Sequence, residues 1–204
     1  MRLLISCIDG LAWPLEKPPP FLADCLDQSA MGSLAGFSDP NDAWLLDGRP
    51  FWPKLSGVGV SLGIMNLPGL WPAQNVKGFM VCRQPGDRAE GHWTHPPEFA
   101  NGLGGYLQPV PLPSGAKDWR TPLKDTAFAE AAALARMRYE HFRRLCAERL
   151  PEVGALGWSA LTSARRLFGH EAGRAGLMLT QLYAYIAWLR DEFQPKALVL
   201  IGTG

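Results

Sequence analysis

The chain has 204 residues, of which 47% are apolar, and this is enough to bury the core of one domain. Its 20 basic and 19 acidic side chains give a formal net charge of +1, so composition supplies no field that would attract nucleic acid or an anionic membrane. We therefore expect neither of them as a partner. The four cysteines are widely spaced, form no Cys-x-x-Cys pair and are expected to be reduced core residues.

The chain opens with an apolar run, from Met1 to Ile8, that ends in Asp9-Gly10. This run predicts a strand buried on both faces, and it puts Asp9 at the carboxyl edge of the sheet, where open α/β folds bind ligands. Asp9 is the first candidate metal ligand, and the alternative is that Asp9-Gly10 only turns the chain. The run is too short for a signal peptide and no small-residue cleavage site follows it, so we expect a cytoplasmic protein.

Short apolar strands and a long loop-rich segment are expected next. The strands lie at 58–66 and 78–82, and each ends near turn-forming residues. From 83 to 122 glycine and proline dominate, and only 99–107 suggests a short helix. We expect 83–122 to be a long insertion, which in a compact domain is usually functional or disordered.

The clearest predicted helix runs from 125 to 150. Apolar residues recur in it at spacings of four and three, while charged residues fall largely on the other side. Four of its arginines are expected on the solvated face, because glutamates lie between them: Arg136, Arg138, Arg143 and Arg144.

A strand at 153–161, a mostly apolar helix at 171–193 and a strand at 197–201 complete the pattern. The apolar stretch 175–189 is shorter than a bilayer span, so we expect a buried helix and no membrane span. Strands and helices in alternation, with strands apolar on both faces, predict an α/β fold. In it a mostly parallel sheet is covered by helices as a three-layer sandwich.

Several blocks of the sequence resemble one family. They are Ile8-Asp9-Gly10, Phe51 to Ser56, Gly63 to Pro72, Val76 to Val81, and Thr94 to Glu98. The chain resembles the type I phosphodiesterase and nucleotide pyrophosphatase branch of the alkaline phosphatase superfamily, whose members have a strand ending in Asp-Gly and then a segment similar to W…G…xGxxNxPxxxPxxxVxGFxV. The resemblance spans roughly the length of the chain, and its middle block is the specific part. It implies a single alkaline-phosphatase-like domain over residues 1–204.

The resemblance also implies a phosphohydrolase with two divalent metal ions, usually zinc, in which a Thr or Ser attacks phosphorus. Each ion needs three or four protein ligands, and the two ions lie about 4 Å apart. Asp9 matches the first ligand. Ser38 is the hydroxyl nearest to the family's nucleophile position, with a turn or helix cap as its alternative role. His170 is a candidate for the family's metal-binding histidine, although Arg166 then stands in the place of an aspartate; a solvated or capping role is the alternative.

Other candidate features have less support from their pattern. His92 and His95 form a His-x-x-His pair, which without a neighbouring cysteine or carboxylate pair is a weak metal-binding signal. Four tryptophans are expected in proline-rich loops: Trp52, Trp71, Trp93 and Trp119. They could form a surface that binds a partner, or they could equally cover the core beneath long loops.

After the last strand family members have Ser-Asp-His-Gly, whereas this chain reads Gly202-Thr203-Gly204, so the second half of the family's ligand set is either replaced or lies beyond the end of the given sequence. We therefore expect a degenerate, non-catalytic phosphodiesterase-like protein that acts as a binding or assembly subunit. Its partner is expected to be another protein or further copies of itself, and no cofactor is expected. The alternative is a metal-dependent phosphodiesterase using Zn or Mn, either whole or completed by another chain.

Overall fold

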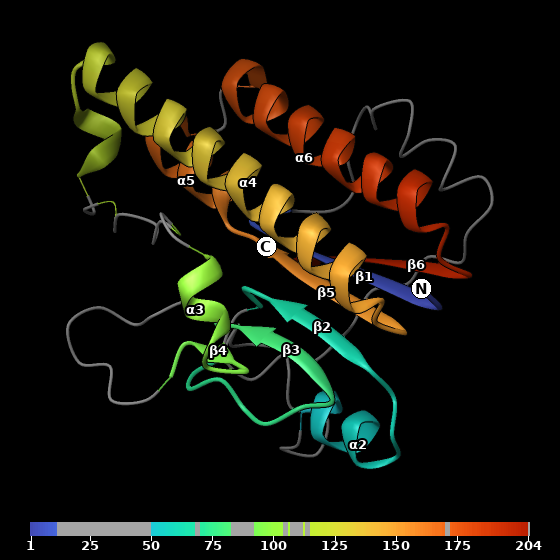
Figure 1. The fold of residues 1–204 in the computed structure, drawn as a ribbon. Helices are drawn as coiled ribbons and strands as arrows, with labels where there is room; N and C mark the ends of the chain where they lie inside the picture. The colour runs from blue at the N-terminus through green and yellow to red at the C-terminus, as the bar shows by residue number, and fades with distance from the viewer. Residues whose placement is uncertain are drawn as a thin grey trace.

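A computed structural model describes residues 1–11, 50–67, 70–82, 92–103, 106, 112, 115–169 and 172–203. Within these residues six strands form one sheet in the order β4-β3-β2-β5-β1-β6 (Figure 1). The strands are β1 (Leu3–Asp9), β2 (Leu62–Met65), β3 (Gly78–Val81), β4 (Thr94–His95), β5 (Val153–Trp158) and β6 (Ala197–Thr203). Their pairings are parallel except for β3 with β4, which confirms the predicted α/β class and mostly parallel sheet.

The central strands are apolar on both faces, as predicted. All six residues of β5 are buried, and β5 lies between β1 and β2. In the register of the sheet Ala155 pairs with Ile5 on one side and with Ile64 on the other. Because the strands are parallel, they present their carboxyl ends at a common edge.

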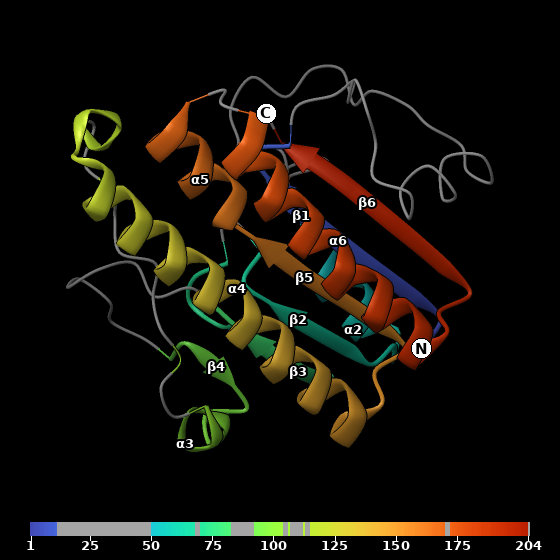
Figure 2. The same cartoon turned by 90° about the horizontal axis from the view of Figure 1, so that it is seen from above.

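Helices lie on both faces of the sheet (Figures 1 and 2). One face is covered by α4 (Thr121–Arg149), α5 (Ala160–Phe168) and α6 (Ala172–Phe193), and the other by α2 (Phe51–Gly57). This arrangement is compatible with the expected three-layer sandwich. A short helix, α3 (Phe99–Gly102), and a 3-10 turn, η3 (Ala116–Asp118), precede α4.

Each face of the sheet has its own core. Under the three long helices the core includes Phe79, Phe142 and Trp158, which are almost fully buried. The core on the side of α2 contains Trp52, whose indole Nε1 donates a hydrogen bond of 2.7 Å to Gln74 Oε1. Burying a large aromatic side chain stabilises a fold by about 1.5–3 kcal/mol, so these residues hold the layers together.

Some predicted boundaries were wrong. The strand expected at 153–161 ends at Trp158, and α5 begins at Ala160, because Ala160, Leu161, Ala164 and Leu167 form one buried helical face. Helix α2 was not predicted. Within the expected insertion 83–122 the structure describes β4, α3 and η3, of which β4 adds an edge strand to the sheet.

The helix expected at 171–193 is observed as α6, but it is not buried on all sides. Met178, Leu182 and Ile186 are fully buried, whereas Leu177 is 62% and Trp188 is 53% exposed. Among the described residues, no helix is long and apolar enough to cross a membrane.

Candidate functional site

Asp9 lies where the sequence predicts it, at the carboxyl edge of the sheet. It is the last residue of β1 and is half-buried. Its backbone pairs in register with Thr203 at the end of β6, and the preceding Ile8 pairs with Trp158 at the end of β5. Asp9 therefore stands between the ends of β5 and β6, at the edge of the sheet at which parallel α/β folds bind ligands.

Gly10 turns the chain directly after Asp9. Gly10 has φ +84°, and the Leu11 N–H donates to the Ile8 carbonyl at 3.3 Å. A Cβ at position 10 would lie 2.8 Å from Thr162 Oγ1 on α5. Only glycine tolerates both the positive φ and this close approach, so the first turn of α5 packs directly beside Asp9.

A buried guanidinium reaches the same edge from α4. Arg138 is 1% exposed, and its Nη1 donates a hydrogen bond of 2.8 Å to the hydroxyl of Ser159, the residue between β5 and α5. The predicted solvated position of Arg138 is therefore wrong, although Arg136, Arg143 and Arg144 are exposed as expected. The signal was present in the sequence, because Arg138 shares the spacing of the buried Ala135 and Phe142.

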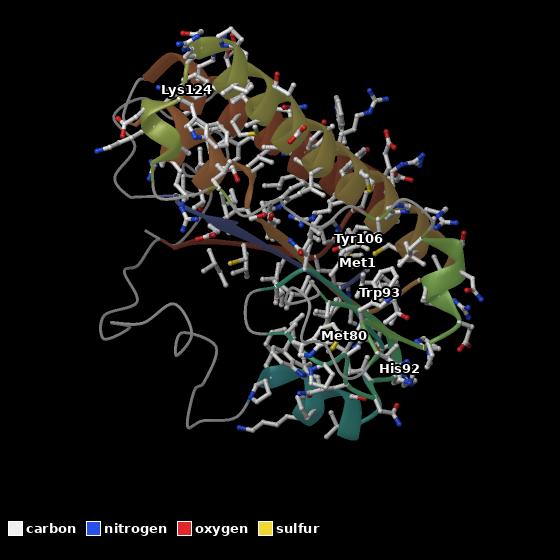
Figure 3. The ribbon with its side chains drawn as sticks, turned by 90° about the vertical axis from the view of Figure 1, so that its left-hand side faces the viewer. Met1, Met80, His92, Trp93, Tyr106 and Lys124 are labelled. Atoms are coloured by element: carbon white, nitrogen blue, oxygen red, sulfur yellow. The ribbon has the colours of Figure 1, made fainter. Side chains whose placement is uncertain are left out.

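Asn66 lies at the same carboxyl edge of the sheet, directly after the end of β2. It is 6% exposed at φ +57°, and its Nδ2 donates to the carbonyl of Gly157 on β5 at 3.0 Å. A Cβ on Gly157 would collide with the Asn66 carbonyl. The Tyr106 hydroxyl donates to Asn66 Oδ1 at 3.5 Å, and the Trp93 ring stacks on Tyr106 at 5.3 Å between centroids (Figure 3). The Asn of the family-like block thus joins β2 to β5.

The described groups around Asp9 do not fit a centre of two zinc ions. The hydroxyl of Thr162 lies beside Gly10, and the hydroxyl of Ser159, at the end of the neighbouring strand β5, accepts from Arg138; both hydroxyls are poor zinc ligands. Arg166 lies one helical turn after Thr162 on the same side of α5, and it is exposed. No group of three or more His, Cys, Asp or Glu side chains that could hold a metal occurs in the described part of the chain. The candidates Ser38 and His170 lie outside the described residues.

The buried thiols supply no nucleophile. Burial, with a smaller effect from the charge of Asp9, raises the pKa of Cys7 to about 12. Burial alone raises the pKa of Cys82 to about 12, and it also raises the pKa of Cys146. These three cysteines are free and buried, as predicted for reduced core residues.

Three of the four tryptophans expected in proline-rich loops pack against the core: Trp52, which lies on helix α2, and Trp71 and Trp93. Trp52 is 4% exposed, and Trp71 and Trp93 pack as half-buried side chains against the two cores. Trp119 is half-buried too. His92 is exposed and His95 is half-buried in β4, next to Trp93 and away from Asp9 in the sheet order. The large exposed aromatic residue of the described chain is Trp188 on α6.

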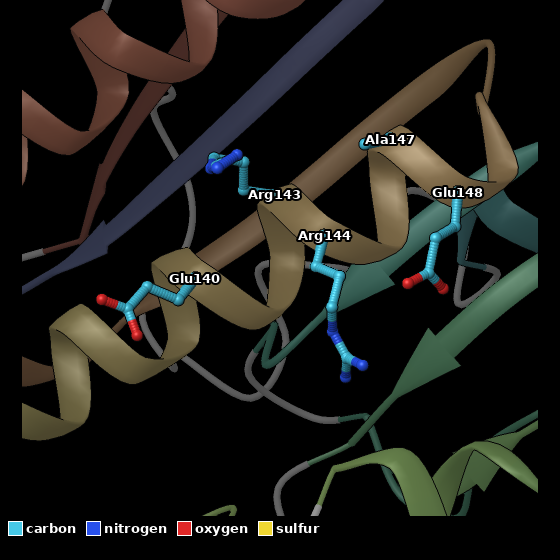
Figure 4. Close-up of a pocket in the computed structure, with 5 residues that line it drawn as sticks. All are labelled: Glu140, Arg143, Arg144, Ala147 and Glu148. Carbon is cyan, nitrogen blue, oxygen red and sulfur yellow. The ribbon is translucent and has the colours of Figure 1, made fainter.

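One surface hollow lies along α4, in the half of the helix that leads to the start of β5 (Figure 4). It is lined by Glu140, Arg143, Arg144, Ala147 and Glu148. Arg144 donates to the carbonyl of Gly102 at 2.6 Å, and Arg143 pairs with Glu192 at 3.3 Å. The lining mixes both charges and lies away from the carboxyl edge, so we assign no binding role to it.

No family model matches this chain, and the comparisons with curated proteins and with solved structures found no match either. The geometry of the chain itself therefore carries the functional argument.

Proposed function

We propose that this protein is a non-catalytic, degenerate member of the type I phosphodiesterase branch and that it acts as a binding or assembly subunit. The observation that supports the proposal is the chemistry of the carboxyl edge. Asp9 ends β1 at the position that the resemblance assigns to a metal ligand, while the groups described at this edge are the Thr162 hydroxyl beside Gly10 and the Ser159 hydroxyl bound by the buried Arg138. Hydroxyls bind zinc weakly, and an arginine close to the edge disfavours a second cation there.

The middle block of the family-like pattern supports the same proposal, because its residues serve the fold. Asn66 joins two strands, and Phe79 is buried in the core under α4. We therefore infer that such a chain can lose metal ligands and still keep the α/β fold that these residues stabilise. A scaffold with exposed apolar side chains, here Leu177 and Trp188, is suited to docking onto another protein.

One observation favours the alternative of an active phosphodiesterase. Asp9 is half-buried at the carboxyl edge, a position open to ligands supplied by another chain.

Hydrolysis of bis-p-nitrophenyl phosphate with added zinc or manganese separates the two functions. The purified chain and its Asp9→Asn variant are compared, since asparagine has almost the same shape and no charge. The proposal predicts no release of p-nitrophenol above the Asp9→Asn background. Hydrolysis that Asp9→Asn abolishes would disprove the non-catalytic proposal and support the alternative.

A further inference from the structure

Basic side chains gather at one end of the helical layer. The segments 115–125 and 160–176 carry η3, the start of α4, α5 and the start of α6. They contain six Lys or Arg and three Asp or Glu residues, whereas the whole chain has 20 and 19, so the remainder of the chain is slightly acidic. Such an uneven distribution of charge is typical of a surface that binds an oppositely charged partner.

Five of these cations lie on three elements that pack together. They are on η3, at the start of α4 and on α5: Lys117, Arg120, Lys124, Arg165 and Arg166. The turn η3 packs against α5. The Lys124 ammonium lies 5.9 Å from the centre of the Phe168 ring on α5 (Figure 3), and Arg165 precedes Phe168 by about one helical turn. We call these five residues the basic patch.

The basic patch lacks the carboxylate partners that arginines have elsewhere on the surface. Four arginines outside it each lie 3.3 Å or less from a carboxylate: Arg2, Arg136, Arg143 and Arg190. At the border of the patch, Arg174 pairs with Asp125 at 2.7 Å. Across the described ranges of the chain, none of the five patch residues forms such an ion pair. Arg165 is nevertheless half-buried, so its charge is partly withdrawn from water without a carboxylate in exchange.

The stability of the fold explains only part of this charge. Arg165 and Arg166 lie in the last turn of α5, where the helix dipole favours cations. The start of α4 is the opposite case, because the amino end of a helix favours acidic residues. Its first turn has no acidic residue, Arg120 is its N-cap residue, and Lys124 follows one turn later. These two cations therefore oppose the dipole of α4, and an anionic partner would compensate them.

We propose that the basic patch binds an acidic segment of a partner protein. Arginine binds a carboxylate through two parallel hydrogen bonds, and three of the five patch residues are arginines. Apolar groups lie among them, since Leu123 is 56% exposed and Trp119, between Lys117 and Arg120 in the chain, is half-buried. Cations around exposed apolar side chains suit a segment in which acidic and apolar residues alternate.

Nucleic acid and anionic lipid fit the basic patch less well. Asp118 is exposed beside Lys117, and the half-buried Asp125 follows Lys124, so carboxylates that repel phosphate groups lie among the cations. Surfaces that bind nucleic acid are much more positive than other interfaces, and lipid-binding segments carry clusters of about four to eight cations. The net charge of the whole chain is only +1. These observations favour a protein partner.

This inference rests on the binding role proposed above, and its test measures association and not hydrolysis. The fluorescence anisotropy of a labelled peptide is followed as the full chain is added. The probe is a fluorescein-labelled helical peptide with glutamates and leucines on one face, and the same peptide with glutamine in place of glutamate is its control. The acidic probe should bind, and its affinity should fall by about threefold or more as salt rises from about 50 to 200 mM.

Charge reversal locates the binding surface. Arg120→Glu combined with Arg166→Glu, both at exposed positions, should weaken binding of the acidic probe by about tenfold or more. Lys54→Glu combined with Arg136→Glu is the matched control, because it changes the net charge equally at exposed positions outside the patch. The control should weaken binding by about twofold at most. Urea unfolding should show the patch variant to be folded and no less stable than the control, since Arg120→Glu suits the amino end of α4.

Several results would overturn the inference: no binding of the acidic probe, equal binding of the glutamine peptide, or equal weakening by the two double variants. Tighter binding of single-stranded DNA or of phosphatidylserine vesicles than of the acidic probe would overturn it in favour of a partner that carries phosphate. A chain that binds the acidic probe and also hydrolyses bis-p-nitrophenyl phosphate through Asp9 would contradict the proposed function and leave the basic patch standing as a binding surface.

Discussion

Replacement of Asn66 tests whether the segment from Gly63 to Pro72, the specific part of the family resemblance, stabilises the fold. The Asn66 side chain spans from the end of β2 to the Gly157 carbonyl on β5, and its backbone has φ +57°. Asn66→Ala removes the amide donor, leaves a buried carbonyl without this partner and forces a Cβ-bearing residue without local hydrogen bonding to keep a positive φ. All three effects favour the unfolded chain.

The size of the effect follows from these terms. Loss of the buried hydrogen bond, with its acceptor left in place, costs about 1–3 kcal/mol. Alanine in the left-handed region adds about 1 kcal/mol relative to asparagine or glycine. We therefore expect Asn66→Ala to lower the free energy of unfolding by about 2–4 kcal/mol, and Asn66→Gly by about 1 kcal/mol less than that.

Urea unfolding followed by tryptophan fluorescence and by circular dichroism measures both variants. The comparison of alanine with glycine separates the backbone term from the hydrogen bond, because only alanine resists the positive φ. If the free energy of unfolding of Asn66→Ala lies within about 0.5 kcal/mol of the wild-type value, the claim that Asn66 stabilises the fold is refuted.

Three further predictions concern the same edge and the core beneath it. Ser159→Ala removes one acceptor of the buried Arg138 and should lower the free energy of unfolding by about 1.5–3 kcal/mol; an unchanged urea midpoint would mean that this hydrogen bond contributes nothing. Trp158 Nε1 donates to Ser6 Oγ at 2.7 Å, so Trp158→Phe and Ser6→Ala should show a coupling energy of about 1 kcal/mol in a double-mutant cycle, and strict additivity would argue against the bond. Burial raises the pKa of Cys7 from 9.0 to about 12, so above pH 9 the unfolded chain releases a proton that the folded chain keeps. Stability should therefore fall by up to about 1.4 kcal/mol per pH unit from this thiol between pH 9 and 12, and Cys7→Ala should reduce the slope. If stability falls with pH equally steeply in Cys7→Ala and in the wild type, the raised pKa of Cys7 is contradicted.

Much of the fold could be predicted because it depends on local patterns. The apolar run that ends in Asp9-Gly10 placed the first strand and its carboxylate correctly, since strands buried on both faces read as continuous apolar runs. The recurrence of apolar residues at spacings of three and four predicts both ends of α4 to within a few residues. In contrast, α5 is short and directly follows a strand, so the apolar residues at its start continue the apolar pattern of β5 and predict a longer strand.

The composition of the site could not be predicted, because it depends on contacts between distant segments. Thr162 meets Gly10, and Arg138 reaches Ser159, through the packing of α4 and α5 at the end of the sheet. The charge of Arg138 favours a solvated position, although its spacing places it on the buried face of α4. The exposure of Trp188 runs against the opposite expectation, because an apolar residue on an apolar helix is predicted to lie in the core.

The zinc content of the chain tests the central claim most directly. Wild type and Asp9→Asn are dialysed against micromolar zinc, and bound metal is counted by atomic emission spectroscopy. We predict fewer than one zinc ion per chain, with no difference between the two proteins, because the described part of the chain brings no group of three or more His, Cys, Asp or Glu side chains together. Two zinc ions per wild-type chain, lost in Asp9→Asn, would contradict the account.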